Sequence, residues 1–378
     1  MKLLHLADTH ISDRRSIAGK VIERQGLNLA LFDTARCLDV VINYVRNNGI
    51  DLVLYAGDVF DFWKPTPEEY RLALETVTEI AKHCRIVIIP GNHDVAKSGR
   101  SHGLIPFKYL RNPNLFFSDI PEIIDLDECQ VFTLPYPTPS LLRTNDQYKN
   151  LTIEELNGVV SSILQKVLRG FEVQRDEGRI SIILGHITVA GAMYSESQIV
   201  PMHDISIPKK CLTWADYVAL GHLHLSQEFY PGSINREGFG DEKDLKGFRV
   251  VTIEKGKESL IEFIETPARS YRTFTLNEFV EFMAEKPEVD KETIVRIKDE
   301  VTKEEYEKAK ELFTRQPFTY LQNSVVIARE ARRRSKEATV DMTIDRAIEN
   351  FVEVNDQYRE ILGPMKEKAK LLEARLGG

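Results

Sequence analysis

The stretch Asp51-Leu-Val-Leu-Tyr-Ala-Gly57-Asp58-Val-Phe-Asp61 decides how the rest of the chain is interpreted. Its apolar run, 52–56, is short and continuous, which predicts a strand buried on both faces of a sheet. Gly57 ends the run, and the acid Asp58 follows at once. In open α/β sheets the functional site lies beyond the carboxyl ends of the strands, where Asp58 is expected. Aspartate is also an ordinary turn residue, so one such stretch carries little weight alone.

Four further strand-like runs end in residues that bind metals or transfer protons. The blocks are Asp8-Thr-His10 after 2–6, Gly91-Asn92-His93-Asp94 after 85–89, Gly185-His186 after 180–184, and Gly221-His222-Leu-His224 after 217–220. Five of the nine histidines fall in these blocks. Singly, Asp8 or Asp58 is also explained as a turn acid, and His186 as a hydrogen-bonded polar residue. Taken together, the five blocks favour one shared site.

The five blocks resemble the calcineurin-like metallophosphoesterases. In chain order they are D-x-H, G-D-x-x-D, G-N-H-D, G-H and G-H-x-H, each after a strand. The resemblance implies an α/β fold, namely a four-layer α/β/β/α metallophosphoesterase sandwich. The strands first alternate with helices and later follow one another directly, which agrees with two packed sheets flanked by helices.

The side chains of these blocks suit a pair of divalent metal ions. Histidine, aspartate and asparagine supply the nitrogen and oxygen ligands that Mn²⁺, Fe or Zn²⁺ accept. Two-metal phosphoesterases also need one carboxylate shared by both ions. The resemblance implies that Asp58 is this bridge, that Asp8, His10 and His224 complete one ion, and that Asn92, His186 and His222 complete the other. The expected cofactors are two ions of Mn²⁺.

His93 is predicted to be catalytic and not a metal ligand. In the family this position contacts the scissile phosphate and helps to protonate or stabilise the leaving oxygen, which suits an imidazole. Asp94 is predicted to hold His93 in orientation. Asp61 has two interpretations, a partner of a metal ligand or a polar residue at a helix start. Some relatives carry histidine at the position of Asp61.

Composition and charge limit the classes of protein to which this chain can belong. The chain has 378 residues, 42% of them hydrophobic and 29% charged, which is typical of a soluble globular protein with two or more domains. No apolar run approaches the roughly 20 residues that span a bilayer, and no signal-peptide pattern is present, so a cytoplasmic location is expected. The four cysteines form no CxxC pair and are expected to be reduced. A net charge of −8 argues against a generic nucleic-acid coat but not against a nuclease.

A narrower resemblance, to SbcD-type nuclease subunits, comes from the second half of the chain. It is carried by Tyr217–His224, Tyr230–Arg236, Phe239-Gly-Asp and Lys246-Gly-Phe248. It implies a Mn²⁺-dependent enzyme that degrades double-stranded DNA ends 3′ to 5′ and cuts single strands endonucleolytically. It also implies a homodimer bound to an SbcC-type, SMC-like ATPase in double-strand-break repair. The helix after Thr66 and the segment 104–110 are the expected dimer-forming region.

Four segments are predicted. Residues 1–268 form the metallophosphoesterase (nuclease) domain, 269–328 a small α+β unit that faces DNA as a cap, 329–340 a basic linker, and 341–378 a helical ATPase-binding tail. In the tail, apolar residues recur at helical spacing and are the predicted partner contacts: Ile344, Ile348, Phe351, Leu362 and Leu372. The alternative is that the tail folds back on its own cap.

Two rival functions remain open. One is a metallophosphoesterase that acts on small phosphodiesters; the cap and tail argue against it, because a small substrate does not need them. The other is a protein that binds DNA ends with weak catalysis, and the intact ligand set argues against that.

Overall fold

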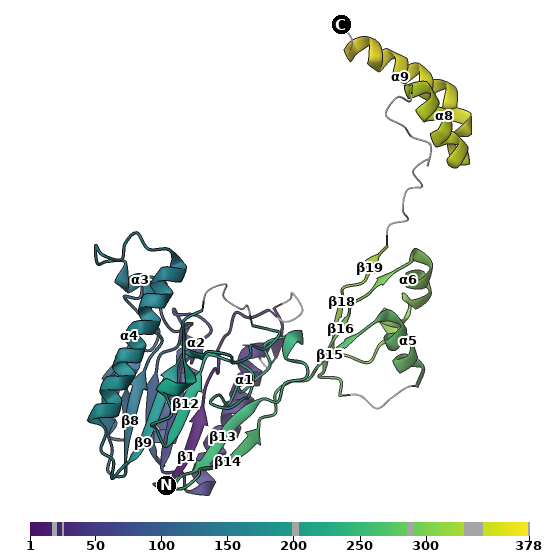
Figure 1. Ribbon diagram of the computed structural model, residues 1–378. Helices are drawn as coiled ribbons and strands as arrows, with labels where there is room; N and C mark the ends of the chain where they lie inside the picture. Colours follow the sequence, from purple (N-terminus) through teal and green to yellow (C-terminus); the bar gives the residue numbers. More distant parts are fainter. Residues whose placement is uncertain (17–20, 25, 199–203, 286–289, 329–342, 377–378) are drawn as a thin grey trace. The chain divides into compact units, whose positions relative to one another are not determined.

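The computed structural model describes residues 1–16, 21–24, 26–198, 204–285, 290–328 and 343–376 (Figure 1). Its contacts divide the chain into two compact units. The first comprises Met1–Asp299 and Ala309–Val325, and the second Glu300–Lys308 and Val326–Gly378. Among the described residues, no helix has both the length and the apolar character needed to cross a membrane.

A six-stranded sheet forms one half of the first unit, in the order β14-β13-β1-β4-β5-β6. Its strands are β1 (Lys2–Leu6), β4 (Leu52–Ala56), β5 (Arg85–Ile89), β6 (Leu115–Phe117), β13 (Gly247–Thr252) and β14 (Leu260–Glu265). β1, β4, β5 and β6 are parallel, whereas β13 and β14 are added antiparallel at the β1 edge. Because neighbouring parallel strands end at the same edge, the loops after β1, β4 and β5 meet.

A four-stranded sheet forms the other half, in the order β12-β9-β8-β7. Its strands are β7 (Ile123–Asp125), β8 (Cys129–Leu134), β9 (Ile180–His186) and β12 (Tyr217–Gly221). β8, β9 and β12 are parallel, and β7 pairs antiparallel with β8. Consequently the ends of β9 and β12 also lie together.

Three apolar clusters stack the sheets and helices in layers. Helices α1 (Leu29–Asn48) and α2 (Pro67–Ala81) pack on one face of the six-stranded sheet. The opposite face of that sheet packs on the four-stranded sheet, and α4 (Ile153–Gln174) covers the outer face of the latter. Successive side chains of a strand point to opposite faces of the sheet. In β1, Leu4 and Leu6 therefore face the helices, while Leu3 faces the second sheet.

The long helices begin where the sequence signals predict. Thr66 with Glu69 forms a capping box ahead of α2, and Thr152 with Glu155 forms one ahead of α4. Gly49 ends α1 with a left-handed φ of 58°. Short elements complete this part of the unit: β2 (Glu23–Arg24), β3 (Leu27–Asn28), η1 (Ile105–Tyr109), α3 (Pro139–Leu142), β10 (Thr188–Val189), β11 (Ser206–Ile207), η2 (Lys209–Cys211) and η3 (Phe239–Asp241).

A small three-stranded parallel sheet also belongs to the first unit. It comprises β15 (Tyr271–Phe274), β16 (Ile294–Ile297) and β18 (Tyr320–Asn323), with α5 (Leu276–Glu285) and α7 (Leu312–Arg315). The Arg269 guanidinium donates to both carboxylate oxygens of Asp33, at 2.6 and 2.7 Å, and so ties this sheet to α1. The predicted boundary at residue 268 and the cap role stay predictions.

The second unit holds the tail helices. They are α8 (Ile344–Val354), η4 (Asp356–Ile361) and α9 (Leu362–Leu376), and the unit also includes β17 (Glu300–Val301), β19 (Val326–Ile327) and most of α6 (Lys303–Ala309). Val352 is buried between the tail helices, and Lys366 forms an ion pair with Glu349. The predicted basic linker, 329–340, lies outside the described residues, as does the side chain of Leu372.

Candidate metal centre

The predicted ligands meet at one edge of the two sheets. Asp8 and His10 follow β1, Asp58 follows β4, and Asn92 follows β5. From the second sheet, β9 ends at His186, and β12 is followed directly by His222 and His224. The structure thus brings all seven predicted ligands together, although they are spread over more than 200 positions of sequence.

The backbone is strained at four of these ligands. Asp8, His10, Asp58 and His222 have φ values of 50°, 42°, 49° and 99°. Across the described ranges, no other residue except glycine has a positive φ. Such conformations cost about 1–3 kcal/mol each and persist at sites where function requires them. The strain therefore marks this sheet edge independently of residue type.

Glycines let the loops approach closely. A Cβ on Gly91 would lie 2.2 Å from Oδ1 of Asp58, and one on Gly221 would lie 2.0 Å from the carbonyl oxygen of Ala56. Neither position therefore has room for a side chain. The glycines of the G-D-x-x-D, G-N-H-D and G-H-x-H blocks are needed because the predicted ligands and the neighbouring backbone occupy the space that a Cβ would fill.

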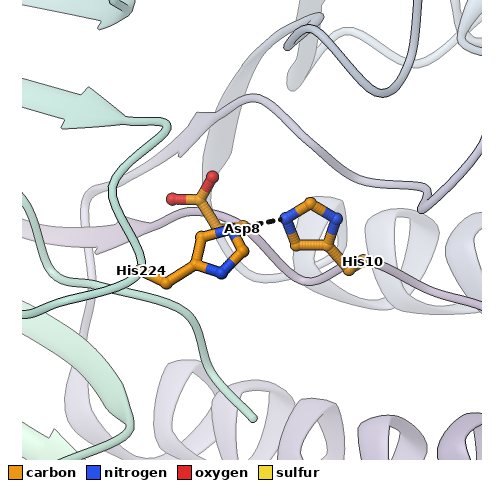
Figure 2. A group of neighbouring side chains, drawn as sticks. All are labelled: Asp8, His10 and His224. Carbon is orange, nitrogen blue, oxygen red and sulfur yellow. Dashed lines mark hydrogen bonds between the residues drawn. The ribbon is translucent and has the colours of Figure 1, made fainter. Parts of the chain in front are cut away.

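The first ligand cluster consists of Asp8, His10 and His224 (Figure 2). One potential ligand atom of each residue lies within 4.8 Å of the others, and all three residues are buried. Nε2 of His10 is 3.0 Å from Nε2 of His224. The Asp8 carboxylate accepts the main-chain N–H of His222 at 2.9 and 3.1 Å, which fixes it beside the two rings.

The second cluster consists of Asp58, His186 and His222, again within 4.8 Å. Asn92 joins it, since its Oδ1 lies 3.0 Å from Nε2 of His186 and 2.8 Å from Nδ1 of His222. His186 Nδ1 donates to the carbonyl oxygen of Ala56 at 2.8 Å. That bond leaves Nε2 of His186 as the nitrogen available to a metal ion.

Asp58 lies between the two clusters. Its Oδ2 is 3.2 Å from Nε2 of His186 in the second cluster and 3.7 Å from Nε2 of His10 in the first. Burial would raise the pKa of Asp58, but the His186 and His93 imidazoles hold that pKa well below its ordinary value. An ionised carboxylate in this position is the ligand that two ions would share.

Carboxylates dominate the electrostatics of the clusters. Burial disfavours a charged imidazole, but Asp58 raises the pKa of His186 to about 9. For His10, burial is likewise outweighed by Glu237 and Asp61, and the pKa rises to about 10. The surplus of negative charge favours the binding of cations.

The donor set fits a pair of divalent ions. Three of the predicted ligands have a ring nitrogen that faces a carboxylate: Nδ1 of His10 faces Asp61 at 3.6 Å, Nε2 of His222 faces Asp204 at 3.4 Å, and Nδ1 of His224 faces Glu237 at 3.7 Å. These carboxylates orient the rings so that the opposite nitrogens, Nε2 of His10 and His224 and Nδ1 of His222, face the clusters. Mixed nitrogen and oxygen donors of this kind suit transition metals better than Ca²⁺.

His93 lies at the margin of the clusters with its side chain 43% exposed. Its Nδ1 donates to the main-chain carbonyl of Asp61 at 3.0 Å, so Nε2 is left available to a substrate. The ring stands edge-on to His10, with centroids 4.7 Å apart. His93 also comes within 4.8 Å of His10 and Asp58, which is close enough for metal ligation.

Asp94 acts on the backbone and not on the His93 ring. Its buried carboxylate accepts the main-chain N–H groups of Val59, Phe60 and Gly91 at 3.2, 2.9 and 2.8 Å. These bonds join the loop that carries Asp58 to the loop that carries Asn92. The predicted orientation of His93 is provided by the Asp61 carbonyl instead.

Sequence reasoning left out Arg15 and Glu237, and it left the role of Asp61 open. The Arg15 guanidinium donates to Asp61 at 2.9 Å and to Glu237 at 3.1 Å. Asp61 is 3.6 Å from Nδ1 of His10, and Glu237 is 3.7 Å from Nδ1 of His224. Asp61 therefore lies beside the predicted metal ligand His10. Arg15 lies in a polar stretch without periodicity, so no sequence signal marked it.

A polar layer behind the first cluster fixes the His222–His224 segment. Gln198 donates to the carbonyl oxygen of His222 at 2.7 Å and accepts the main-chain N–H of His224 at 2.9 Å. The buried Lys246 ammonium donates to the carbonyl oxygen of His224 at 3.1 Å. The strained turn at His222 is thus held by side chains from two other segments.

A cavity of about 260 Å³ opens onto both clusters. It is lined by Asp58, Asn92, His93, Tyr194, Ser197, Gln198, His222, His224 and Glu237. A substrate in this cavity would meet the shared carboxylate, the second-cluster ligands and the exposed His93 together.

Comparison with known proteins agrees with this geometry. The sequence model of the calcineurin-like phosphoesterases matches residues 1–226. The chain belongs to the calcineurin-like phosphoesterase family. Members hydrolyse phosphate esters with bound metals, and this chain is accordingly a metal-dependent phosphodiester hydrolase with an α/β fold. Both predictions are confirmed.

Individual calcineurin-like relatives add detail. The chain is 29% identical over 278 residues to the SbcD component of the SbcCD nuclease of Staphylococcus epidermidis, which covers 68% of this chain and 67% of the relative. The resemblance to SbcD-type nucleases is thereby confirmed. Among solved structures, GAP50 of Plasmodium aligns with 71% of this chain and 85% of its own, at 12% identity and a TM-score of 0.40. The phosphopantetheinyl hydrolase of Mycobacterium tuberculosis aligns with 60% and 84%, at 12% identity and a TM-score of 0.34.

Proposed function

We propose that this chain is the nuclease component of an SbcCD-like complex that processes DNA ends in double-strand-break repair. Its activities are those of a Mn²⁺-dependent 3′ to 5′ exonuclease on double strands and an endonuclease on single strands. The observation that carries the proposal is the arrangement of two ligand clusters around Asp58, with the exposed His93 beside them. The SbcD relative supports DNA as the phosphodiester substrate.

The bound ions and the residues around them have different roles in hydrolysis. When bound, two divalent ions lower the pKa of water and offset the charge that develops on the phosphate. Asp58 holds the clusters in a fixed relation, because one of its oxygens faces both. His93 meets the phosphate at the open side of the cavity, where its Nε2 stabilises the leaving oxygen. Asp94 and Gln198 keep the ligand-bearing loops in place.

Partners are part of the proposal. The exposed apolar residues of α8 and α9 support docking of an SbcC-type ATPase on the tail. Ile344 and Phe351 are 45% and 41% exposed, whereas Ile348 and Leu362 are half-buried. Homodimerisation is proposed through α2 and the segment 104–110, where Ile105 and Tyr109 are exposed. A cytoplasmic location agrees with reduced cysteines, and all four are free thiols.

The decisive experiment measures the cleavage of several substrates by protein that has been stripped of metal and reloaded with Mn²⁺, Mg²⁺ or Zn²⁺. End-labelled duplex, hairpin and circular single-stranded DNA are tested beside bis(p-nitrophenyl) phosphate. We expect Mn²⁺-dependent shortening of duplex from 3′ ends and nicking of the single-stranded circle, both absent in Asp58→Asn. Hydrolysis of the small diester without DNA cleavage would instead support a small-molecule phosphodiesterase. DNA binding without cleavage of any substrate would support an end-binding protein.

A further inference from the structure

Two aromatic residues directly follow the loop that carries Asp58. Phe62 and Trp63 come after Asp61, and the Phe62 side chain is 49% exposed while Trp63 is half-buried. Their rings lie 6.2 Å apart between centroids and are tilted by 51°. The family motif ends at Asp61, so ligand binding by the loop does not account for these residues. Neighbouring aromatic rings with exposed faces, next to a functional site, offer a surface for an aromatic or apolar ligand.

Cations accompany both rings. The Arg14 guanidinium lies 5.8 Å from the centroid of Phe62, and the Lys64 ammonium lies 4.6 Å from that of Trp63. Arg14 also donates to the carbonyl oxygen of Lys64 at 2.8 Å, which links the two cation–aromatic pairs. Asp13 lies 3.5 Å from the Arg14 guanidinium. Paired rings and cations are what single-stranded nucleic acids bind, because bases stack on the rings while cations attract phosphates.

The aromatic pair is coupled to the metal centre by Asp61. The Asp61 side chain accepts from Arg15 and approaches His10, while its main-chain carbonyl accepts from Nδ1 of His93. Phe62 is the next residue, and adjacent Cα atoms are about 3.8 Å apart. The two rings therefore belong to the residues that directly follow the carbonyl that orients His93.

We propose that Phe62 and Trp63, with Arg14 and Lys64, form a stacking platform for unpaired bases of the DNA strand that enters the metal centre. This rests on the proposed nuclease function and specifies its substrate as a strand whose bases are unstacked beside the scissile phosphate. The platform explains the exposure of Phe62, because an unpaired base covers the ring. The Lys64 ammonium offsets the strand's charge, whereas the charge of Arg14 is already paired with Asp13 and Glu69. A protein partner would gain nothing from cations placed against the rings unless it carried matching acids.

The first test measures binding, independently of cleavage. Trp63 and Trp214 are the chain's two tryptophans, and Trp214 packs against Phe132 on the other sheet. In Trp214→Phe protein, Trp63 is the remaining tryptophan reporter. Adding a short single-stranded oligonucleotide in the presence of EDTA should quench its fluorescence. An oligonucleotide of equal length with abasic sites in place of bases should bind without quenching. Equal quenching by both oligonucleotides, or by neither, would overturn the proposal.

The second test combines substitutions in the full-length protein with removal of the bases from the DNA. Phe62→Ala with Trp63→Ala should weaken single-strand binding roughly 5- to 150-fold, as expected for the loss of one stacked base. The same change should have no effect on the abasic oligonucleotide. Phe62→Trp should retain wild-type affinity. The matched control is Val173→Ala in α4, an exposed apolar residue, which should leave both affinities unchanged.

The outcomes separate this proposal from the proposed nuclease function. If the wild-type protein cleaves DNA and the alanine variant binds and cleaves equally well, the platform is wrong and the nuclease assignment stands. If the wild type cleaves no DNA, the nuclease assignment itself fails. If the alanine variant keeps its DNA affinity but changes its mass by light scattering, the rings form a contact between copies of the chain, which also overturns the platform.

Discussion

The main-chain N–H of His93 donates a 2.8 Å hydrogen bond to the carboxylate of Asp58. The acid that both ligand clusters share is therefore bonded to the backbone of the exposed imidazole. Since Asp94 joins the same two loops from behind, their spacing is set by main-chain groups. The side chain of His93 can accordingly be changed without removing the bond that places Asp58.

His93→Ala should separate catalysis from metal binding. We expect the variant to keep both ions and its affinity for DNA, because its N–H to Asp58 remains. We expect its rate on single-stranded DNA to fall on the order of 10²–10⁴-fold, since the imidazole that stabilises the leaving oxygen is gone. Metal content by mass spectrometry and single-turnover rates check this. Loss of one ion would show that His93 is a ligand. His83→Ala, a partly exposed histidine paired with Glu79, is the control and should change neither quantity.

Asp58→Asn should weaken both ions together. Each cluster loses the charge of the carboxylate oxygen that lies 3.2 Å from His186 and 3.7 Å from His10. Changes in residues that merely support metal ligands already cost about 10–100-fold in affinity, so a loss beyond tenfold is expected for each ion. Calorimetric titration with Mn²⁺ measures this. The idea is wrong if one ion binds with wild-type affinity. Asp127→Asn, at an exposed position, serves as the control.

Asp94→Ala should act mainly on stability. The substitution leaves three main-chain N–H groups, those of Val59, Phe60 and Gly91, without the acceptor they have in the interior. Each unsatisfied group costs about 1–3 kcal/mol, so the free energy of unfolding should fall by about 3 kcal/mol or more. Urea denaturation of the metal-free protein gives the value. An unchanged free energy would mean that water or another group replaces the carboxylate.

The positions of the ligands could be predicted from sequence because local signals determine them. A short apolar run, a glycine and a ligand-type side chain place Asp58 at a strand end, and parallel pairing of β1, β4 and β5 brings three such ends together. The capping boxes at Thr66 and Thr152 likewise act over three residues. Strand ends and helix starts depend on a few neighbouring residues, and the structure has them where the sequence predicts.

Long-range polar partners could not be predicted in the same way. Arg15 and Glu237 are 222 positions apart yet form an ion pair beside His10. Lys246 supports His224 from another loop. Asp94 was expected to orient the neighbouring His93, but folding places main-chain N–H groups nearer to its carboxylate.

Self-association should depend on exposed residues of the segment 104–110. Leu104 and Phe107 are buried in the core, and Leu110 packs against it, so charges there would unfold the chain. Tyr109 is 76% exposed and offers a clean test. Tyr109→Glu should convert a dimer to a monomer by light scattering without lowering the melting temperature. A dimer that persists in this variant and in Ile105→Glu would remove this surface from consideration.

The tail prediction rests on what α8 and α9 leave uncovered. Val352 of α8 is buried, and Phe351 of α8 stacks on Tyr358 of η4, with ring centroids 5.5 Å apart. Ile344, Phe351, Ile361 and Leu371 nevertheless remain 41–64% exposed. A helical pair this small buries too little apolar surface to be a stable domain alone, so a partner is expected to cover these residues.

Deleting residues 341–378 should therefore abolish co-purification with an SbcC-type ATPase and ATP-dependent processing of blocked ends. Mn²⁺-dependent cleavage of single-stranded DNA should stay nearly intact, because no metal ligand or cavity residue identified in the described ranges belongs to the tail. Phe351→Glu should reproduce the loss of the ATPase in the full chain, whereas Ile163→Glu, a similarly exposed apolar residue of α4, should not. If the truncated protein is unfolded or has lost its metals, the tail completes the chain's own core. The exposed residues would then be covered from within and not by the ATPase.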